Sequence, residues 1–262
     1  MQTVTTSMTA PADGGMPMPR VFGAYLAEIR SECLRYLRNP GFMLPLTLFP
    51  TVFYLMFGVL MNHGHPDAAR YLLASYSTFG VMGPGLFGFG VSLALERDGG
   101  LLTLKRALPM PSGAYLLGKM VMAMVAAGVV VTLMLLLSVF AAHVPLSAAQ
   151  MLALLAMGVL GVLPFCALGM FVGTLIKGQG APGLLNLVYL PMSFLSGLWF
   201  PLSAMPHWLG AIAPVWPSYH LNAIAQRAVG LSHQPVGTHA LVLLGVAAGL
   251  LMLAARRLRR YG

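Results

Sequence analysis

The chain has 262 residues, of which 58% are hydrophobic and only 8% are charged. Soluble domains contain about 45–50% apolar and about 25% charged residues, so this composition excludes a water-soluble fold. A formal net charge of +9 would suggest nucleic-acid binding in a soluble protein, but the positions of the basic residues described below favour membrane topology instead, and no nucleic-acid partner is expected.

The first segment, residues 1–19, is small, polar and rich in proline, and it lacks the apolar stretch of about 7–15 residues that a cleavable signal peptide needs. We expect a disordered tail. Over 20–39, apolar residues then recur every three or four positions, which predicts an amphipathic helix. Its apolar stripe is Phe22, Tyr25, Leu26, Ile29, Cys33, Tyr36 and Leu37, while Arg30, Glu32, Arg35 and Arg38 fall off it. This helix is expected to lie in the membrane interface or to pack on the end of a helix bundle.

Residues 40–262 are predicted to form one all-α membrane domain with six spans. A helix needs about 20 apolar residues to cross about 30 Å of hydrocarbon. The six stretches that meet this requirement are Phe42–Met61, Tyr71–Leu95, Met120–Ala142, Met151–Ile176, Leu184–Ser203 and Thr238–Ala255.

The basic residues fix the expected orientation. Of the 15 Lys and Arg residues, all except Arg70 and Arg227 lie before the first span, between spans two and three, between spans four and five, or after the last span. These four segments share one side of the membrane, so the positive-inside rule places both termini in the cytoplasm. We expect an integral protein of a bacterial inner membrane, in contact with anionic lipid. Cys33 and Cys166 then lie away from the oxidising side, and no disulfide is expected.

Glycine and proline mark the second span, which contains Gly83, Pro84 and Gly85. Such a cluster favours either a hinge or close helix packing, and close packing is the preferred interpretation; Gly169 and Gly173 in the fourth span pose the same choice. No Asp, Glu, Lys or Arg lies between Lys119 and Lys177. Because ion-coupled carriers usually hold a charged group within the membrane, the energy for any transport is expected to come from elsewhere.

After the fifth span, residues 205–236 are too long for a bare loop and too interrupted by proline for a span. We expect two short re-entrant helices, His207–Ala213 and Ser218–Ala228, that dip into the outer leaflet with Trp208 among their interfacial anchors. His63 and His65 have metal-ligand spacing, but no further ligand set completes a site, and no metal is expected.

Two patterns raise the possibility of enzyme chemistry. The stretch from Gly113 to Lys119 fits GxxxxGK, but Met120 replaces the Ser or Thr that holds Mg²⁺ and no strand precedes it, so a nucleotide site is not expected. Ser196-Gly197 ends like the GxSG of rhomboid-type proteases, and His239 opens the last span. An intramembrane serine hydrolase using Ser196 and His239 therefore remains the alternative from another functional class.

The charged stretch Glu96–Pro109 resembles the loop between the second and third spans of ABC-2-type transporter permeases, whose pattern is roughly E-R-E-x-G-T-L-E-x-L-L-x-T-P. Two positions depart from it, since Leu101 stands where the family has Thr and Thr103 where it has Glu. The stretch Phe194–Leu209, followed by Pro217 and Tyr219, is similar to the family's second signature before the last span.

This resemblance implies a permease subunit that is not itself an enzyme and needs no cofactor of its own. It implies a homodimer of permeases that binds an ABC ATP-binding subunit, which holds ATP and Mg²⁺. The residues expected to couple the permease to that subunit are Glu96, Arg97, Asp98, Gly100, Leu102, Leu104, Lys105, Arg106 and Pro109.

The expected cargo is a hydrophobic drug-like or lipid-like compound moving outward, as in multidrug exporters, with a polysaccharide or glycolipid as the alternative. Aromatic residues on the fifth span, Tyr189, Phe194, Trp199 and Phe200, are the candidates for lining its path.

Overall fold

The computed structural model describes residues 17–62, 65–107 and 111–261, except for the side chains of Arg106, Ser112 and residues 258–261. Within this part of the chain every regular element is helical. The α-helices are α1 (Met18–Leu37), α2 (Pro40–Phe53), α3 (Pro66–Gly83), α4 (Gly90–Asp98), α5 (Leu101–Ala107), α6 (Ser112–Phe140), α7 (Ala148–Gly161), α8 (Leu163–Gly173), α9 (Ala181–Leu195), α10 (His207–Ile212), α11 (Pro217–Ala228) and α12 (Val236–Tyr261).

Wider and tighter helical turns connect several of these helices. The π-helical segment η1 (Tyr54–Leu60) extends α2, and η2 (Pro84–Phe89) makes α3 and α4 one continuous rod. Short 3-10 turns form η3 (Gly178–Gly180), η4 (Leu202–Ala204) and η5 (Ala213–Val215).

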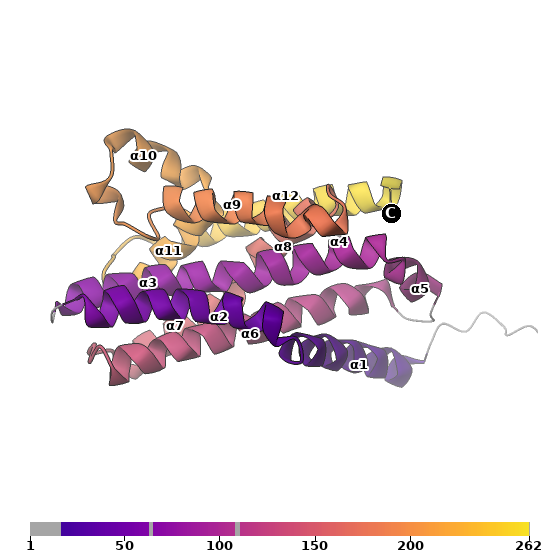
Figure 1. The fold of residues 1–262 in the computed structure, drawn as a ribbon, viewed down its shortest axis with the longest axis horizontal. Coiled ribbons are helices and arrows are strands. Elements are labelled where there is room, and N and C mark those ends of the chain that lie inside the picture. Colours follow the sequence, from indigo (N-terminus) through magenta and orange to yellow (C-terminus); the bar gives the residue numbers. More distant parts are fainter. Residues whose placement is uncertain (1–16, 63–64, 108–110, 262) are drawn as a thin grey trace, which may run out of the picture.

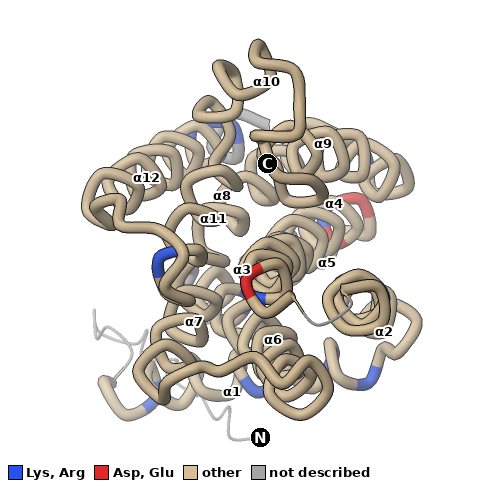
Figure 2. Tube along the Cα trace, turned by 90° about the vertical axis from the view of Figure 1, so that its left-hand side faces the viewer, with Lys and Arg blue, Asp and Glu red and all other residues tan. Residues whose placement is uncertain are grey.

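Among the described residues, five helices are long and apolar enough to cross a membrane. They are Pro40–Leu60, Pro66–Asp98, Gly113–Phe140, Ala148–Gly173 and Val236–Arg257. These five correspond to the predicted spans one to four and six. Figure 1 shows their long axes running roughly side by side, and Figure 2, which looks along the bundle, shows Lys, Arg, Asp and Glu at few positions on them.

The predicted fifth span, Leu184–Ser203, is shorter in the structure. It forms α9, a helix of 15 residues that ends at Leu195. At about 1.5 Å per residue this helix is about 22 Å long, less than the hydrocarbon thickness of about 30 Å. The helix ends there because Gly197 adopts φ +75°, a left-handed conformation that favours glycine, and Pro201 follows.

Even so, the α9 segment extends from one end of the bundle to the other. Before its start, the backbone nitrogen of Gly178 donates to Asp98 Oδ2 at 2.5 Å, at the end of α4. After its end, Gly197 O accepts from Tyr71 Oη at 2.7 Å, near the start of α3. Because α3 and α4 form one rod, these two contacts lie at opposite ends of the rod.

Glycines hold this central rod close to α8. A Cβ added to Gly85 would lie 2.8 Å from Phe165 Cβ, and one added to Gly90 would lie 2.8 Å from Gly169 O. A Cβ at Gly173 would in turn lie 2.7 Å from Gly90 O. Side chains at these positions would push the two helices apart, so the glycines of the second and fourth spans serve close packing.

The amphipathic helix predicted over 20–39 is α1, which begins at Met18 and packs against α6. Part of its apolar stripe faces outward, since Phe22 and Leu26 are 66% and 51% exposed. Glu32, which the sequence pattern placed off the apolar face, is 3% exposed. The helix therefore turns part of its charged side toward the bundle, next to α5 (Figure 1).

The segment between α9 and α12 forms the two predicted short helices, α10 and α11. The first lies at the surface, where Trp208 is 62% exposed. The second packs against α3, α7 and α12 and buries Leu221, Asn222 and Ala225. Both lie toward the end of the bundle away from α5 (Figure 1).

Candidate functional site: a buried charge cluster beside α5

Helix α5 connects the ends of α4 and α6 at one end of the bundle. The Gly99-Gly100 turn precedes it, and Gly100 adopts φ +74°, a conformation that side chains disfavour. Gly99 N donates to Leu95 O at 2.9 Å to close α4, and Leu104 N donates to Gly100 O at 3.2 Å to open α5. The two hydrogen bonds place α5 directly after α4, separated by one turn.

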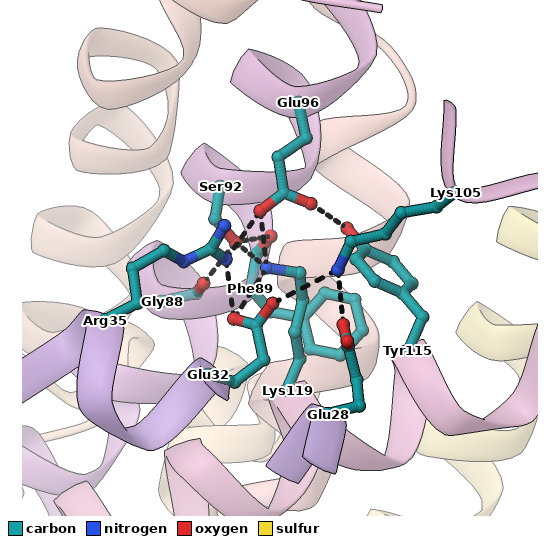
Figure 3. A network of polar contacts seen from close by, with 10 residues as sticks. All are labelled: Glu28, Glu32, Arg35, Gly88, Phe89, Ser92, Glu96, Lys105, Tyr115 and Lys119. Atoms are coloured by element: carbon teal, nitrogen blue, oxygen red, sulfur yellow. Dashed lines mark hydrogen bonds and ion pairs between the residues drawn. The ribbon is translucent and has the colours of Figure 1, made fainter. Parts of the chain in front are cut away.

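Beside α5 lies a cluster of charged side chains from four helices, which we call the charge cluster (Figure 3). Its members are Glu28, Glu32 and Arg35 of α1, Glu96 of α4, Lys105 of α5, and Tyr115 and Lys119 of α6.

Lys119 occupies the centre of the charge cluster. Its Nζ lies 2.9 Å from Glu96 Oε1 and 3.2 Å from Glu32 Oε2, and it donates to Ser92 Oγ at 2.8 Å. The side chain is fully buried, with 0% exposed. Lys119 is also the lysine of the GxxxxGK pattern, and here it binds carboxylates from a helix that no strand precedes. The geometry is therefore that of an internal ion pair rather than a phosphate site.

Arg35 and Tyr115 complete the surroundings of Glu96. Arg35 Nη2 lies 2.5 Å from both Glu32 Oε2 and Glu96 Oε1, and Tyr115 Oη donates to Glu96 Oε2 at 2.7 Å. Burial lowers the pKa of Arg35, but the carboxylates of Glu96 and Glu32 outweigh that effect and raise it overall. The guanidinium therefore stays charged.

Lys105 ties α5 to α1. Its ammonium group pairs with Glu28 Oε1 and lies 3.6 Å from Glu32 Oε1. With Lys105 included, three carboxylates face three basic groups, so the charge cluster is balanced. This balance matters because an uncompensated charge is costly to bury, whereas a paired and hydrogen-bonded one is tolerated.

Arg97 and Asp98 bind a different element, the connection between α8 and α9. Arg97 Nη1 and Nη2 donate to Thr174 O at 2.8 Å and Ile176 O at 2.6 Å. Asp98 accepts from Gly178 N, and Arg257 Nε of α12 donates to Thr174 O at 3.2 Å. The end of α4 is thus joined both to the charge cluster and to the ends of α8, α9 and α12.

The predicted coupling residues therefore have different surroundings. Glu96, Arg97, Asp98 and Lys105 make contacts within the chain, and Leu102 packs against the hydrophobic core. Leu104 is 60% exposed, and Gly100 forms the exposed turn. The side chain of Arg106 and the whole of Pro109 lie outside the described residues.

Five of the cluster members are absent from the predicted coupling residues: Glu28, Glu32 and Arg35 of α1, and Tyr115 and Lys119 of α6. The composition could have pointed to Glu28 and Glu32, because the chain has only six acidic residues. Two of those six, Glu28 and Glu32, stand one helical turn apart in α1. Two acids one turn apart repel each other, so the pair indicates basic partners on another element, which the structure identifies as Lys105 and Lys119.

The predicted cargo-path residues form two separate pairs. Tyr189 stacks on Phe79 with ring centroids 4.7 Å apart, and Trp199 packs edge-on against the same ring at 5.8 Å. Tyr189 also lines an apolar groove of about 700 Å³ between α2 and α9. Phe194 and Phe200 contact each other at the surface, 41% and 54% exposed.

The residues suggested for a serine hydrolase have other partners. Ser196 Oγ donates to Met192 O at 2.7 Å and lies 2.5 Å from Ser218 Oγ. Both ring nitrogens of His239 have other partners, since Nδ1 lies 2.9 Å from His220 Nδ1 and Nε2 lies 3.0 Å from Gln234 Oε1. This geometry does not pair Ser196 with a histidine base, so the hydrolase alternative has no support from the structure.

No group of three His, Cys, Asp or Glu residues within the described ranges is arranged to hold a metal ion. His63, half of the His63 and His65 pattern, lies outside those ranges.

Comparison with known proteins gives two matches. The family model described as "ABC-2 type transporter" matches residues 24–228. A Bacillus subtilis (strain 168) protein named "Putative transport permease YvfS" is 30% identical over 234 residues, which cover 88% of this chain and 94% of that relative. The matched region includes the charge cluster and α5.

Proposed function

The chain belongs to the ABC-2 type transporter family, and from that membership we propose that it is the permease of an ATP-driven exporter whose ATP-binding subunit docks on α5. Membership makes it the membrane subunit of an ABC transporter, so a partnering ATP-binding subunit is implied. The docking site, the direction of transport and the cargo are the parts that we propose.

The exposed face of a firmly held α5 is the observation that carries the docking proposal. Leu104 presents an apolar side chain that is 60% exposed, while Lys105 beside it binds carboxylates of α1. ATP hydrolysed outside the membrane moves helices only through a contact stiff enough to transmit displacement. A short helix fixed on one side and open on the other meets that requirement.

From α5, a displacement would reach much of the bundle through polar contacts. Lys105 of α5 is paired with Glu28 of α1, and Glu32 of α1 is paired with Lys119 of α6. The short Gly99-Gly100 turn leads to α4, whose Arg97 holds the connection between α8 and α9. In this proposal the ATP-binding subunit displaces several helices together, because α1, α4, α6 and the connection between α8 and α9 are linked at this end of the bundle.

We further propose six membrane crossings, with α9 and the residues after it forming the fifth. The contacts of Gly178 and Gly197 with opposite ends of the α3 and α4 rod support this count. α10 and α11 are then re-entrant elements on the outer side. With that topology the basic segments, both termini and α5 face the cytoplasm of a bacterial cell.

For the cargo we propose a hydrophobic drug-like or lipid-like compound that uses the groove between α2 and α9. Its lining is mostly apolar and includes Phe49, Phe53, Tyr189 and Leu190, with Asn186 as a polar member. A polysaccharide or glycolipid is the second candidate. We also propose a homodimer of permeases, as the family resemblance implies, with ATP and Mg²⁺ held by the partner subunits.

Affinity purification of this chain in mild detergent tests the proposal. An ATPase subunit is expected to co-purify with the chain in a stoichiometric ratio and to hydrolyse ATP. Recovery of the folded chain without any ATPase from its native cells would overturn it. A purified chain that cleaves lipid or peptide, with the activity lost in Ser196→Ala, would instead establish the hydrolase.

A further inference from the structure

A polar pocket of about 240 Å³ lies at the end of the bundle opposite α5. Its lining residues belong to α3, the connection after α9, α11 and the segment before α12, and Figure 1 shows α11 toward the end of the bundle away from α5. Its polar lining includes Tyr71, Ser203, Tyr219, Asn222, Gln226 and Gln234. We call it the outer polar pocket, because the proposed topology places it on the outer side of the membrane.

The lining of the outer polar pocket is uncharged. None of its lining residues is Asp, Glu, Lys, Arg or His, so the pocket offers no counter-charge to an ion. Its polar side chains are amides and hydroxyls, which both donate and accept hydrogen bonds, and Pro201, Leu202 and Ala223 add apolar surface. Such a lining matches a neutral group that also does both, and hydroxyl groups have this property.

Several of these polar groups have no partner within the described residues. Asn222 is only 5% exposed, and its contact with Ser75 Oγ is long, at 3.4 Å from Asn222 Oδ1. Its amide nitrogen donates to no described residue, and neither the side chain of Gln226 nor the hydroxyl of Tyr219 makes a hydrogen bond in this part of the chain. Polar groups held in a pocket without partners are available to a ligand.

Size and aromatic content narrow the class of ligand. Pockets for drug-sized molecules measure about 300–1,000 Å³, so this one suits a smaller group, of the size of a single ring. Tyr71 and Tyr219 provide aromatic surface beside the amides. Tyr219 packs edge-on against His220 at 5.4 Å between ring centroids, which fixes its orientation. A ring with apolar C–H faces and hydroxyl edges complements this combination.

We propose that the outer polar pocket binds a single neutral sugar ring, either free or as the head group of a lipid-linked sugar. The proposal deepens the transport function and rests on the proposed topology for its outward position. If the ring belongs to the cargo, the pocket selects the polar end of an amphiphile, separately from the apolar groove between α2 and α9.

Binding is tested on the purified chain in phosphatidylcholine nanodiscs, without the ATP-binding subunit. The probes are the methyl β-D-glycosides of glucose, galactose, mannose and N-acetylglucosamine, together with octyl β-D-glucoside. Saturation-transfer NMR provides the Kd. Gln226→Leu and Tyr219→Phe are expected to weaken binding about tenfold, because each removes hydrogen-bonding groups from the pocket with little change in shape.

Gln179→Leu provides the matched control, since it makes the same amide-to-alkyl change at an exposed position near the other end of α9. It is expected to bind as the unmodified chain does. Binding of the octyl glucoside alone identifies a lipid-linked sugar, and equal binding of methyl glucoside identifies a free ring. Both outcomes support the proposal if the pocket variants lose them.

Two results would overturn the proposal. One is a folded chain that binds no glycoside of the panel, and the other is binding unchanged in Gln226→Leu and Tyr219→Phe. Because the assay contains no ATP-binding subunit, its failure leaves the docking of α5 unaffected. Failure of the co-purification experiment likewise leaves this binding result unaffected.

Discussion

Lys119 Nζ and Glu96 Oε1 lie 2.9 Å apart, and only 0% and 6% of the two side chains are exposed. The lysine belongs to α6 and the glutamate to α4, the two helices that α5 connects. The pair therefore joins the two helices α4 and α6 directly, beneath the connection that α5 forms between them. Because Glu32 of α1 binds the same lysine, the loop and the N-terminal helix share one ion network.

Replacing Lys119 with Met is expected to destabilise the protein by roughly 3 kcal/mol, since three carboxylates would then face only two basic groups in a buried site. Unfolding in mixed micelles measures the free energy. The control is Lys177→Met at an exposed lysine, expected to change it by less than about 0.5 kcal/mol. The pair of changes Lys119→Met and Glu32→Gln should recover part of the loss, and an unchanged stability in Lys119→Met would show that the network is not needed.

Leu104→Asp is expected to abolish export and co-purification of the ATPase while leaving the fold intact. The side chain is 60% exposed, so the new charge remains in water until a partner covers it. Leu104→Met keeps the surface apolar and should keep both activities. Leu102→Asp makes the same change at a residue packed on the core, so it should lower the amount of folded protein instead. Normal export by Leu104→Asp at wild-type abundance would refute docking on this face of α5.

The crossing by α9 is tested with single cysteines in a chain carrying Cys33→Ser and Cys166→Ala. Thr103→Cys and Ser203→Cys are both at exposed positions, one on α5 and one on η4. With six spans, a membrane-impermeant maleimide added to intact cells labels only Ser203→Cys. Labelling of neither position until the cells are opened would mean that α9 does not cross, and the six-span topology would be wrong.

Tyr189→Ala is expected to reduce export of a hydrophobic dye several-fold, because it removes the ring that stacks on Phe79 and lines the groove between α2 and α9. Tyr189→Phe removes only the hydrogen bond from Tyr189 Oη to Phe79 O and should retain most of the transport. Phe200→Ala is the control, since Phe200 is outside the groove and 54% exposed. Dye accumulation in cells with the paired ATPase measures all three, and equal export by Tyr189→Ala would exclude the groove as the path.

Hydropathy predicted five of the spans because a long apolar helix is a local property of the sequence. Pro66–Asp98 contains the predicted second span, and Gly113–Phe140 covers all but the last two residues of the predicted third span and begins earlier. The end of α9 was harder to predict, because its apolar stretch continues past Leu195 while the backbone turns at Gly197. Hydropathy averages over such a turn, whereas a single glycine in a left-handed conformation ends the helix.

The three- and four-residue hydrophobic spacing in α1 could not predict which of its charged residues surround α5. Glu32 and Arg35 fall off the apolar stripe of α1, which for an isolated helix indicates exposure. The burial of Glu32 depends on docking of α1 against α6, where Lys119 needs compensating charge, while Arg35 remains 45% exposed. For the same reason the family resemblance pointed to the loop around α5 but did not indicate that Glu96, Arg97 and Asp98 bind within the chain.

The arrangement of the charge cluster also bears on biogenesis. Glu32 and Glu96, the two carboxylates paired with Lys119, both precede it in the sequence, so the ribosome makes these partners before the lysine emerges. A nascent chain that inserts from its N-terminus can therefore neutralise Lys119 as the third span enters the bilayer. A circularly permuted chain that begins at α6 would present the lysine first, and its insertion should depend far more on the translocon.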